Sequence, residues 1–242
     1  MNMPSNSKLV KETAYDKKNA AGYDSYRFTD KSGKAIHKME TSRLFQSLTF
    51  PPTGARVLEV GCGTGRLMRE VSDRGYIVDG ADASGPMLEE ASAKFSEMEN
   101  KPEFILCEAA VIPIPDASYD LCYSIRLLNQ TESPEYALRV VNEILRVTKP
   151  GGQALIEFVN QNRPRWGMNQ RSTTRLRPIA VREAAEAAGA QFLGWKGAFF
   201  ISMQAYKKCP DMFLPIAAAI DSCLSSLFPR LCSRVYLNVK KR

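Results

Sequence analysis

RVLEVGCGTGRL, residues 56–67, indicates a buried strand that runs through a glycine turn into a helix. The apolar run at 57–60 is typical of the middle of a parallel sheet, where helices cover both faces. Three glycines stand at alternate positions, Gly61, Gly63 and Gly65. They let the backbone bend tightly and approach a ligand that a Cβ atom would exclude. Apolar residues at helical spacing follow at 67–71, so we expect free N–H groups of a helix to face a bound nucleotide.

Apolar runs of strand length alternate with helix-spaced runs along most of the chain. We expect further strands at 75–82, 102–107, 121–124, 154–159, 191–200 and 235–239. We expect helices at 34–48, 134–148, 179–188 and 211–228, and one more that begins after Ser84, a good N-cap residue. This alternation predicts a mostly parallel α/β sheet with helices on both faces. Ligands of such sheets bind outside the carboxyl ends of the strands.

The length of 242 residues suits a single domain of this class. We expect an N-terminal helical cap in residues 1–50, a cofactor-binding core in residues 51–160, and a substrate-side loop, lid helix and closing strands in residues 161–242. No signal-peptide or membrane-spanning pattern opens the chain, so a cytoplasmic location is expected. The helix at 211–228 is interrupted by Pro215 and carries an aspartate, which favours a lid or packing helix over a membrane anchor.

Charge is unevenly distributed along the chain, whose formal net charge is +7. Residues 1–50 carry +4, residues 51–160 carry −7, and residues 161–242 carry +10. Six arginines and no acidic residue lie between Arg163 and Arg182. Such a segment favours an anionic partner, although basic side chains also serve simply as a solvated surface. The six cysteines lack zinc-ligand spacing, so we expect free thiols and no metal.

Asp82 ends the second expected strand and follows Gly61 by about 20 residues, an interval typical of nucleotide sites. A carboxylate at this place accepts hydrogen bonds from ribose hydroxyls. A nicotinamide-dependent oxidoreductase is one class with this combination. Its fingerprint, however, needs a third glycine five residues after the first, where this chain has Arg66. A bulky arginine would obstruct close packing of the helix on the sheet, so the oxidoreductase is the weaker alternative.

Four segments in order resemble the class I S-adenosylmethionine-dependent methyltransferases of the small-molecule, type 11-like kind. They are VLEVGCGTGRL from Val57, VDGADASGPMLEEA from Val78, EAAVIPIPDASYDLCYS from Glu108 and ILRVTKPGG from Ile144. The resemblance covers residues 55–160 with specific motifs and the rest of the chain more loosely. It implies a Rossmann-like, doubly wound sheet of seven strands. The sheet would be mostly parallel, with the last strand antiparallel at or next to the edge.

The resemblance also implies that S-adenosylmethionine is the cofactor. Its methionine end would lie against the glycine loop and neighbouring strand ends, at Glu59, Gly61, Cys62, Gly63, Gly65 and Ser124. Asp82 would hold the ribose hydroxyls, and the adenine would be bounded by Ala83, Met87, Glu108 and Ala109. Tyr23 and Arg27 resemble positions that close over the methionine carboxylate. Glu108 departs from the family pattern, which more often has aspartate there.

Methyl transfer by this family is an in-line displacement, and the implied acceptor here is a small molecule methylated at oxygen or nitrogen. A hydroxyl acceptor needs a general base. His37, the only histidine, has Glu40 one helical turn away and is a candidate for that role, with an exposed structural histidine as the alternative. Candidate residues for an anionic acceptor are Arg126, Arg163, Arg165 and Trp166.

Nucleic-acid bases are disfavoured as acceptors. Residues 124–130 lack the Asn/Asp-Pro-Pro-aromatic motif of enzymes that methylate amide or exocyclic amino nitrogens. The Cys-Pro pair at Cys209 lies far from the fourth expected strand, which argues against the cysteine-adduct chemistry of pyrimidine methylation. An RNA methyltransferase is therefore a lesser alternative. A catalytically idle cofactor-binding scaffold is another, and the sequence does not define the oligomeric state.

Overall fold

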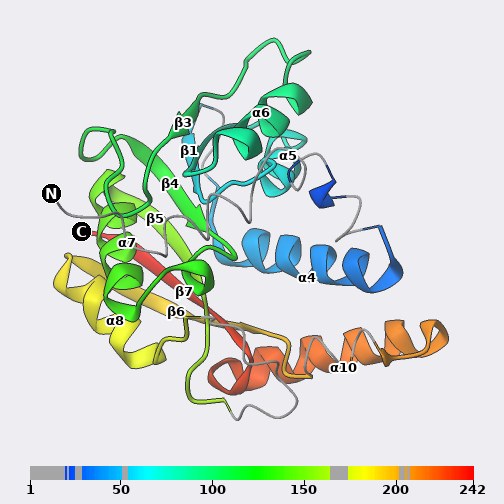
Figure 1. Ribbon diagram of the computed structural model, residues 1–242. Helices are drawn as coiled ribbons and strands as arrows, with labels where there is room; N and C mark the ends of the chain where they lie inside the picture. The colour runs from blue at the N-terminus through cyan, green and yellow to red at the C-terminus, as the bar shows by residue number, and fades with distance from the viewer. Residues whose placement is uncertain are drawn as a thin grey trace, which may run out of the picture.

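A seven-stranded sheet forms the centre of the computed structural model (Figure 1). The structure describes residues 20, 22–24, 29–50, 54–163, 174–201, 205 and 208–242. The strands are β1 (Arg56–Val60), β2 (Ile77–Asp82), β3 (Phe104–Leu106), β4 (Tyr119–Ser124), β5 (Thr148–Val159), β6 (Ala190–Ala198) and β7 (Arg234–Lys241). Their order across the sheet is β3-β2-β1-β4-β5-β7-β6.

Strands β1 to β5 pair in parallel, whereas β7 pairs antiparallel with both β5 and β6. The last strand therefore lies next to the edge of the sheet and β6 forms the edge itself. This arrangement confirms the predicted doubly wound α/β fold with an antiparallel closing strand.

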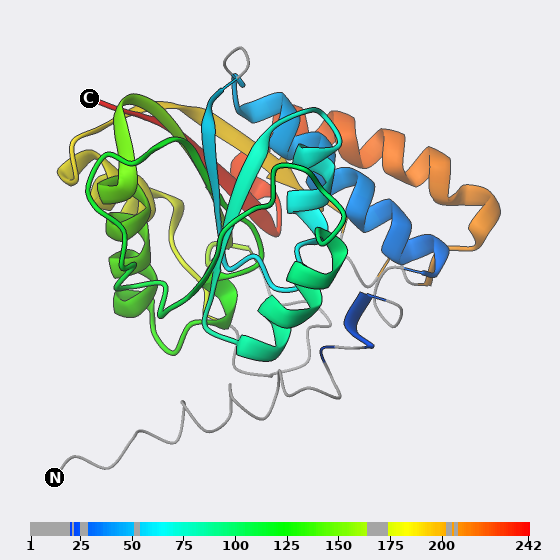
Figure 2. The same ribbon diagram turned by 90° about the horizontal axis from the view of Figure 1, so that it is seen from above.

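Helices cover both faces of the sheet (Figures 1 and 2). They are α4 (Lys31–Ser47), α5 (Arg66–Ser72), α6 (Gly85–Lys94), α7 (Pro134–Val147), α8 (Pro178–Ala187) and α10 (Leu214–Leu227), with short 3-10 turns η1 (Leu128–Gln130), η2 (Asp211–Phe213) and η3 (Pro229–Leu231). One hydrophobic cluster joins the sheet to α7 and α8. A second joins the opposite face to α4, α5, α6 and the start of α10.

Alternation along β1 shows how the sequence produces this layering. Leu58 and Val60 belong to the cluster under α7 and α8, whereas Val57 belongs to the cluster under α4 and α5. All three side chains are fully buried. A strand whose successive side chains enter two different cores is apolar over most of its length, which is the pattern of a central parallel strand.

A capping residue starts α6 where the sequence predicts a start. The Ser84 hydroxyl accepts from the Met87 amide at 3.3 Å and caps α6. At the end of the chain the expectation was wrong in one respect, because Pro215 does not interrupt a helix. It stands in the first turn of α10, where a missing N–H costs nothing. Within the described ranges, no helix has the combined length and hydrophobicity needed to cross a bilayer.

Candidate active site

The loop after β1 takes a conformation that requires glycine. Gly61, Gly63 and Gly65 have φ of 78°, 52° and 72°, which side-chain-bearing residues rarely adopt. A Cβ atom on Gly61 would lie 2.8 Å from the Cβ of Leu127, whereas one on Gly63 would meet no atom within 4 Å. The Gly61 amide donates to the carbonyl of Ala81 at 2.7 Å. The loop is thus anchored at its start and borders open space at its centre.

Asp82, at the end of β2, ties this loop to the next one. Its carboxylate accepts from the Gly63 amide at 2.8 Å and from the Ser84 amide at 2.9 Å. Burial raises the pKa of Asp82, although these backbone N–H groups act in the opposite direction. Each carboxylate oxygen has a second lone pair, so the side chain can accept further hydrogen bonds from a ligand.

Two polar side chains are buried at the ends of the neighbouring strands β1 and β4. Glu59 is 3% exposed and accepts from the Tyr123 hydroxyl at 3.1 Å. Burial raises the pKa of Glu59 to about 8. The Ser124 hydroxyl is also buried, and it has no hydrogen-bond partner among the described residues. Since an unpaired buried hydroxyl is costly, Ser124 is suited to a polar group of a bound molecule.

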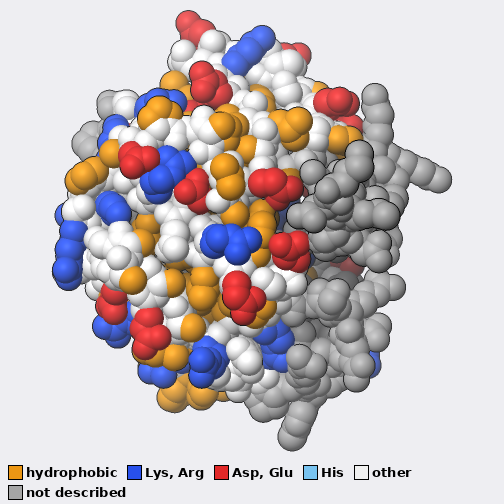
Figure 3. Space-filling model, turned by 60° about the vertical axis from the view of Figure 1, so that its left-hand side comes forward, with side chains coloured by type: hydrophobic (Ala, Val, Ile, Leu, Met, Phe, Trp, Pro, Cys, Tyr) orange, Lys and Arg blue, Asp and Glu red, His pale blue; other side chains and the backbone are white. Residues whose placement is uncertain are grey.

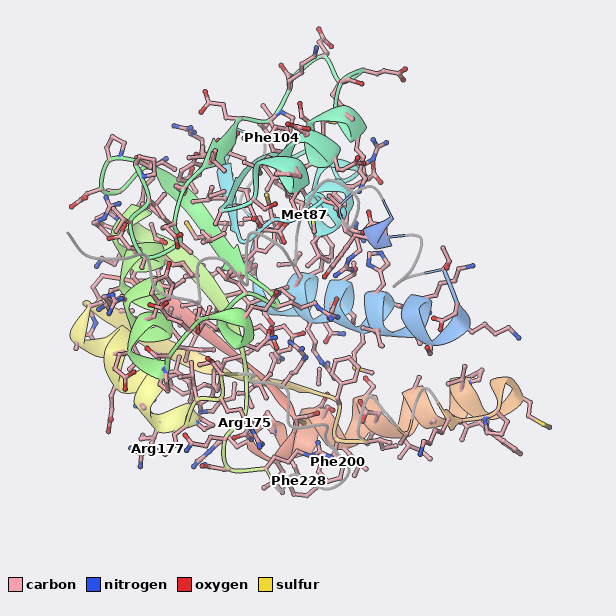
Figure 4. All side chains as sticks on the ribbon, in the orientation of Figure 1. Met87, Phe104, Arg175, Arg177, Phe200 and Phe228 are labelled. Atoms are coloured by element: carbon pink, nitrogen blue, oxygen red, sulfur yellow. The ribbon has the colours of Figure 1, made fainter. Side chains whose placement is uncertain are left out.

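The expected adenine side of the site has one contact that sequence reasoning missed. Glu108 is exposed and accepts from the Tyr136 hydroxyl, in the first turn of α7, at 2.6 Å. Ala109 next to it is half-buried, Ala83 is exposed and Met87 lies buried on α6 (Figure 4). The 28 residues between Glu108 and Tyr136 in the sequence explain why no local pattern signals their contact.

Cys62 lies within the glycine loop and is 6% exposed. Burial raises the pKa of its thiol well above the usual range. The thiol therefore stays protonated and is a packing group in the loop. Its Sγ would lie 2.8 Å from a Cβ at Gly80, so the glycine in β2 makes room for it.

Residues 22–24 lie against the glycine loop. Thr64 donates from its hydroxyl to Asp24 at 2.9 Å, and Lys94 donates to the Thr64 carbonyl at 2.7 Å and to Asp24. Tyr23 is close enough to Arg126 to influence its pKa. This arrangement brings Tyr23 to the side of the site that the sequence predicts, whereas Arg27 lies outside the described residues.

A buried ion-pair cluster next to the site joins three elements that are far apart in sequence. Glu40 of α4 is fully buried and binds Arg66, at the start of α5, at 2.6 Å and Arg126, after β4, at 3.1 Å. Burial favours the neutral form of Glu40, but the two arginines outweigh it and the pKa of Glu40 is below its usual value. Arg126 therefore has an internal carboxylate partner, which the sequence analysis did not foresee.

Arg126 also has an unusual backbone. Its φ is 69°, and its amide donates to Glu157 of β5 at 2.7 Å. The same carboxylate accepts from Arg234 of β7 at 2.5 Å. The loop after β4 is thus held in a strained conformation by charged groups from two neighbouring strands.

His37 has a different carboxylate partner from the one the sequence suggested. Its Nε2 lies 2.9 Å from Glu70, and its Nδ1 contacts the Arg66 guanidinium, while Glu40 binds arginines instead. An arginine only donates, so Nδ1 accepts and Nε2–H donates to Glu70. With its lone pair engaged, His37 links α4 to α5, and its role as a general base stays a prediction.

Two described arginines of the basic C-terminal third bind backbone carbonyls. Arg163 donates to the carbonyls of Phe199 and Phe200, and burial lowers its pKa. Arg175 donates to the carbonyls of Asn160 and Arg163 at 2.6 Å and 2.7 Å (Figure 4). Arg163 therefore holds the chain after β5 to the residues that follow β6, and Arg175 holds residues 160–163 to the segment before α8. Of the other candidate acceptor residues, Arg165 and Trp166 lie outside the described residues.

Comparison with known proteins agrees with this geometry. Residues 57–152 match the family described as a methyltransferase domain. The magnesium protoporphyrin IX methyltransferase of Synechocystis PCC 6803, solved with bound S-adenosylmethionine, superposes with a TM-score of 0.65 at 17% identity. The alignment covers 100% of both chains and shows a shared fold. The chain belongs to the class I S-adenosylmethionine-dependent methyltransferases. The cofactor of this family is S-adenosylmethionine.

Curated relatives of this methyltransferase act on chemically different acceptors. Phosphatidylethanolamine N-methyltransferase of Cereibacter sphaeroides is 35% identical over 61% of this chain and 66% of that protein. The probable tRNA methyltransferase 9B of Mus musculus is 29% identical over 60% of this chain. This chain spans only 28% of the length of that tRNA methyltransferase.

The residues present fit the cofactor of the family. Three features of the site lie at the ends of the adjacent parallel strands β2, β1 and β4 or in the loops directly after them. They are the carboxylate of Asp82, the open space at Gly63 and the unpartnered hydroxyl of Ser124. S-adenosylmethionine is a nucleoside joined to an amino acid. Its hydroxyl, amine and carboxylate groups can form hydrogen bonds with polar groups of this kind. These observations support the site predicted from the sequence.

Proposed function

We propose that this methyltransferase transfers the methyl group of S-adenosylmethionine to an oxygen or nitrogen atom of a small acceptor. The observation that carries the proposal is the bridge from the Gly63 amide through Asp82 to the Ser84 amide, which joins the glycine loop to the ribose-side loop. The glycines at positive φ and this bridge together give the loop the shape that a cofactor site needs.

The protein's part in the reaction is mainly alignment. The bound cofactor supplies an activated methyl group on a sulfonium, which already carries its leaving group. Asp82 and Ser124 would orient the cofactor from the ends of β2 and β4, and Asp24 with Lys94 would hold residues 22–24 over the glycine loop. Such fixed placement of two reactants accounts for a large part of the acceleration in displacement reactions.

The nature of the acceptor is the finer part of the proposal. We infer a small and anionic acceptor, because residues 161–242 carry a charge of +10. The test incubates the protein with methyl-labelled cofactor and separate metabolite, lipid and RNA fractions. Label in an anionic metabolite supports the proposal. Label confined to RNA would establish the alternative that the tRNA methyltransferase relative suggests.

Calorimetry with S-adenosylhomocysteine separates an active enzyme from an idle scaffold. We expect binding with one site per chain, because the glycine loop and Asp82 are intact. Absence of binding would contradict the proposal and favour the scaffold. Binding without label in any fraction would leave the cofactor site supported and count against catalysis.

The pH dependence of stability provides a test of the Glu59 environment. The folded state retains the Glu59 proton up to about pH 8, whereas the ordinary value is 4.5. Between these values the folded state binds more protons than the unfolded chain, so Glu59 lowers the free energy of unfolding as pH rises. We expect the stability of Glu59→Gln relative to wild type to increase with pH, by at most about 1.4 kcal/mol per unit. Urea unfolding at several pH values measures this, and parallel profiles for the two proteins would contradict it.

Replacing His37 with alanine distinguishes a helix link from a general base. Because Arg66 and Glu70 engage both ring nitrogens, we expect His37→Ala to lower the free energy of unfolding by about 1 to 2 kcal/mol. Turnover of the identified acceptor should be largely retained. Lost turnover in a variant with unchanged stability and cofactor affinity would instead identify His37 as the base.

A further inference from the structure

The outward face of α10 is apolar and carries no charge. Five large hydrophobic side chains on α10 and the turn before it are 49–75% exposed: Met212, Phe213, Ile216, Ile220 and Leu227. Cys223 between them is exposed as well. The only charged residue of the helix, Asp221, is fully buried. Monomeric globular proteins seldom leave such a continuous apolar strip open, and where they do it usually marks an interaction site.

Polar contacts fix the rotation of α10 in this orientation. Asp221 accepts from the Ile201 amide at 2.5 Å and from the Ser225 hydroxyl at 3.4 Å on the inner side. Arg43 of α4 donates to the Ser222 carbonyl at 3.4 Å. Rotating α10 about its axis to bury its hydrophobic side chains would break these hydrogen bonds. The fold therefore keeps the apolar strip on the outside of the helix.

The position and surroundings of α10 suit a surface contact. The helix lies at the periphery of the molecule, beside α4 (Figures 1 and 2). By contrast, the face that carries α7 and α8 shows basic, acidic and hydrophobic side chains interspersed (Figure 3). Along the chain, exposed Lys208 precedes the apolar strip and exposed Arg230 follows it, while Asp211 stands next to Met212. Hydrophobic residues bounded by cations match the chemistry of an anionic lipid surface.

The area of the strip argues against a second copy of the chain as the partner. A helix of 14 residues is about 21 Å long and about 10 Å wide, so its outward strip covers about 200 Å². A stable dimer buries about 800 Å² on each partner. Pairing would also bring together two chains with a net charge of +7 each. A lipid surface needs only the insertion of the apolar side chains.

We propose that α10 docks this protein peripherally on an anionic lipid surface. Ile216, Ile220 and their apolar neighbours enter the boundary between headgroups and acyl chains, while Lys208 and Arg230 bind the headgroup phosphates. The helix lies in the plane of the surface and does not span it. This docking is independent of the proposed acceptor and concerns where the reaction takes place.

Vesicle flotation with the full chain tests the proposal. The probes are phosphatidylcholine vesicles with and without phosphatidylglycerol. We expect binding to the anionic vesicles that weakens as salt is added. The double substitution Ile216→Asp/Ile220→Asp should weaken that binding at least tenfold, because each buried isoleucine contributes substantially. The control is Ile179→Asp on α8, whose side chain is 49% exposed, as is that of Ile220.

Three outcomes would overturn the proposal. One is a wild-type protein that does not float with anionic vesicles, and another is equal loss of binding in the Ile179→Asp control. The third is sedimentation of the wild type as a dimer that the double substitution converts to a monomer, because the strip would then be a protein interface. Thermal unfolding and S-adenosylhomocysteine binding, both unchanged in the double variant, verify that it is folded.

Discussion

Glu40→Ala should lower the free energy of unfolding by about 3 to 5 kcal/mol, because it leaves two arginines without their buried partner. Glu40 is completely buried and binds Arg66 and Arg126 together. For a chain of this length the loss corresponds to a melting temperature lower by on the order of 10 °C. Differential scanning calorimetry measures it.

The matched control removes an ion pair on the surface. Asp73 binds Arg69 at 2.8 Å with both side chains more than half exposed, so Asp73→Ala should change stability by less than about 1 kcal/mol. If Glu40→Ala does not fold, Glu40→Gln provides the measurement, since it keeps the shape and one acceptor oxygen. Equal melting of Glu40→Gln, Asp73→Ala and wild type would show that the cluster contributes little.

Asp82→Ala should weaken S-adenosylhomocysteine binding by about 5-fold to 150-fold, which corresponds to 1 to 3 kcal/mol. The substitution removes the acceptor proposed for the ribose and also the bridge between the Gly63 and Ser84 amides. Isothermal titration calorimetry measures the affinity.

Asp82→Asn separates these two contributions. Asparagine keeps one acceptor oxygen but brings an NH₂ group that cannot accept from a backbone amide. We expect an intermediate affinity for this variant. Unchanged affinity in Asp82→Ala would rule out the carboxylate as a ligand of the cofactor.

Local sequence patterns predicted those parts of the fold that depend on neighbours in the chain. The apolar run at 57–60 became a central strand, Ser84 capped α6, and the glycines at 61, 63 and 65 adopted positive φ. Each depends on the intrinsic geometry of one or a few adjacent residues. The cofactor was predicted from the resemblance of four motifs to a known family, and each of these motifs is local in the chain.

Contacts between distant residues had no such signal. The Glu40 carboxylate meets Arg66 and Arg126 across separations of 26 and 86 residues, and the spacing of Glu40 from His37 suggested the wrong partner for both. Arg126 and Arg163 were interpreted as free cations, yet their charges are used within the fold. Which charged side chains form ion pairs depends on how the helices pack on the sheet, and no local sequence pattern records that packing.

The position of β7 has a consequence for the synthesis of the chain. Strand β6 lies at the sheet edge and pairs only with β7, which in turn pairs with β5. Residues 190–198 therefore have no sheet partner until residues 234–241 have left the ribosome. Until then the hydrophobic edge of β5 is uncovered and available for wrong pairing. The cofactor-side strands β1 to β4 are complete much earlier, so co-translational folding should produce the nucleotide half of the sheet before its opposite edge.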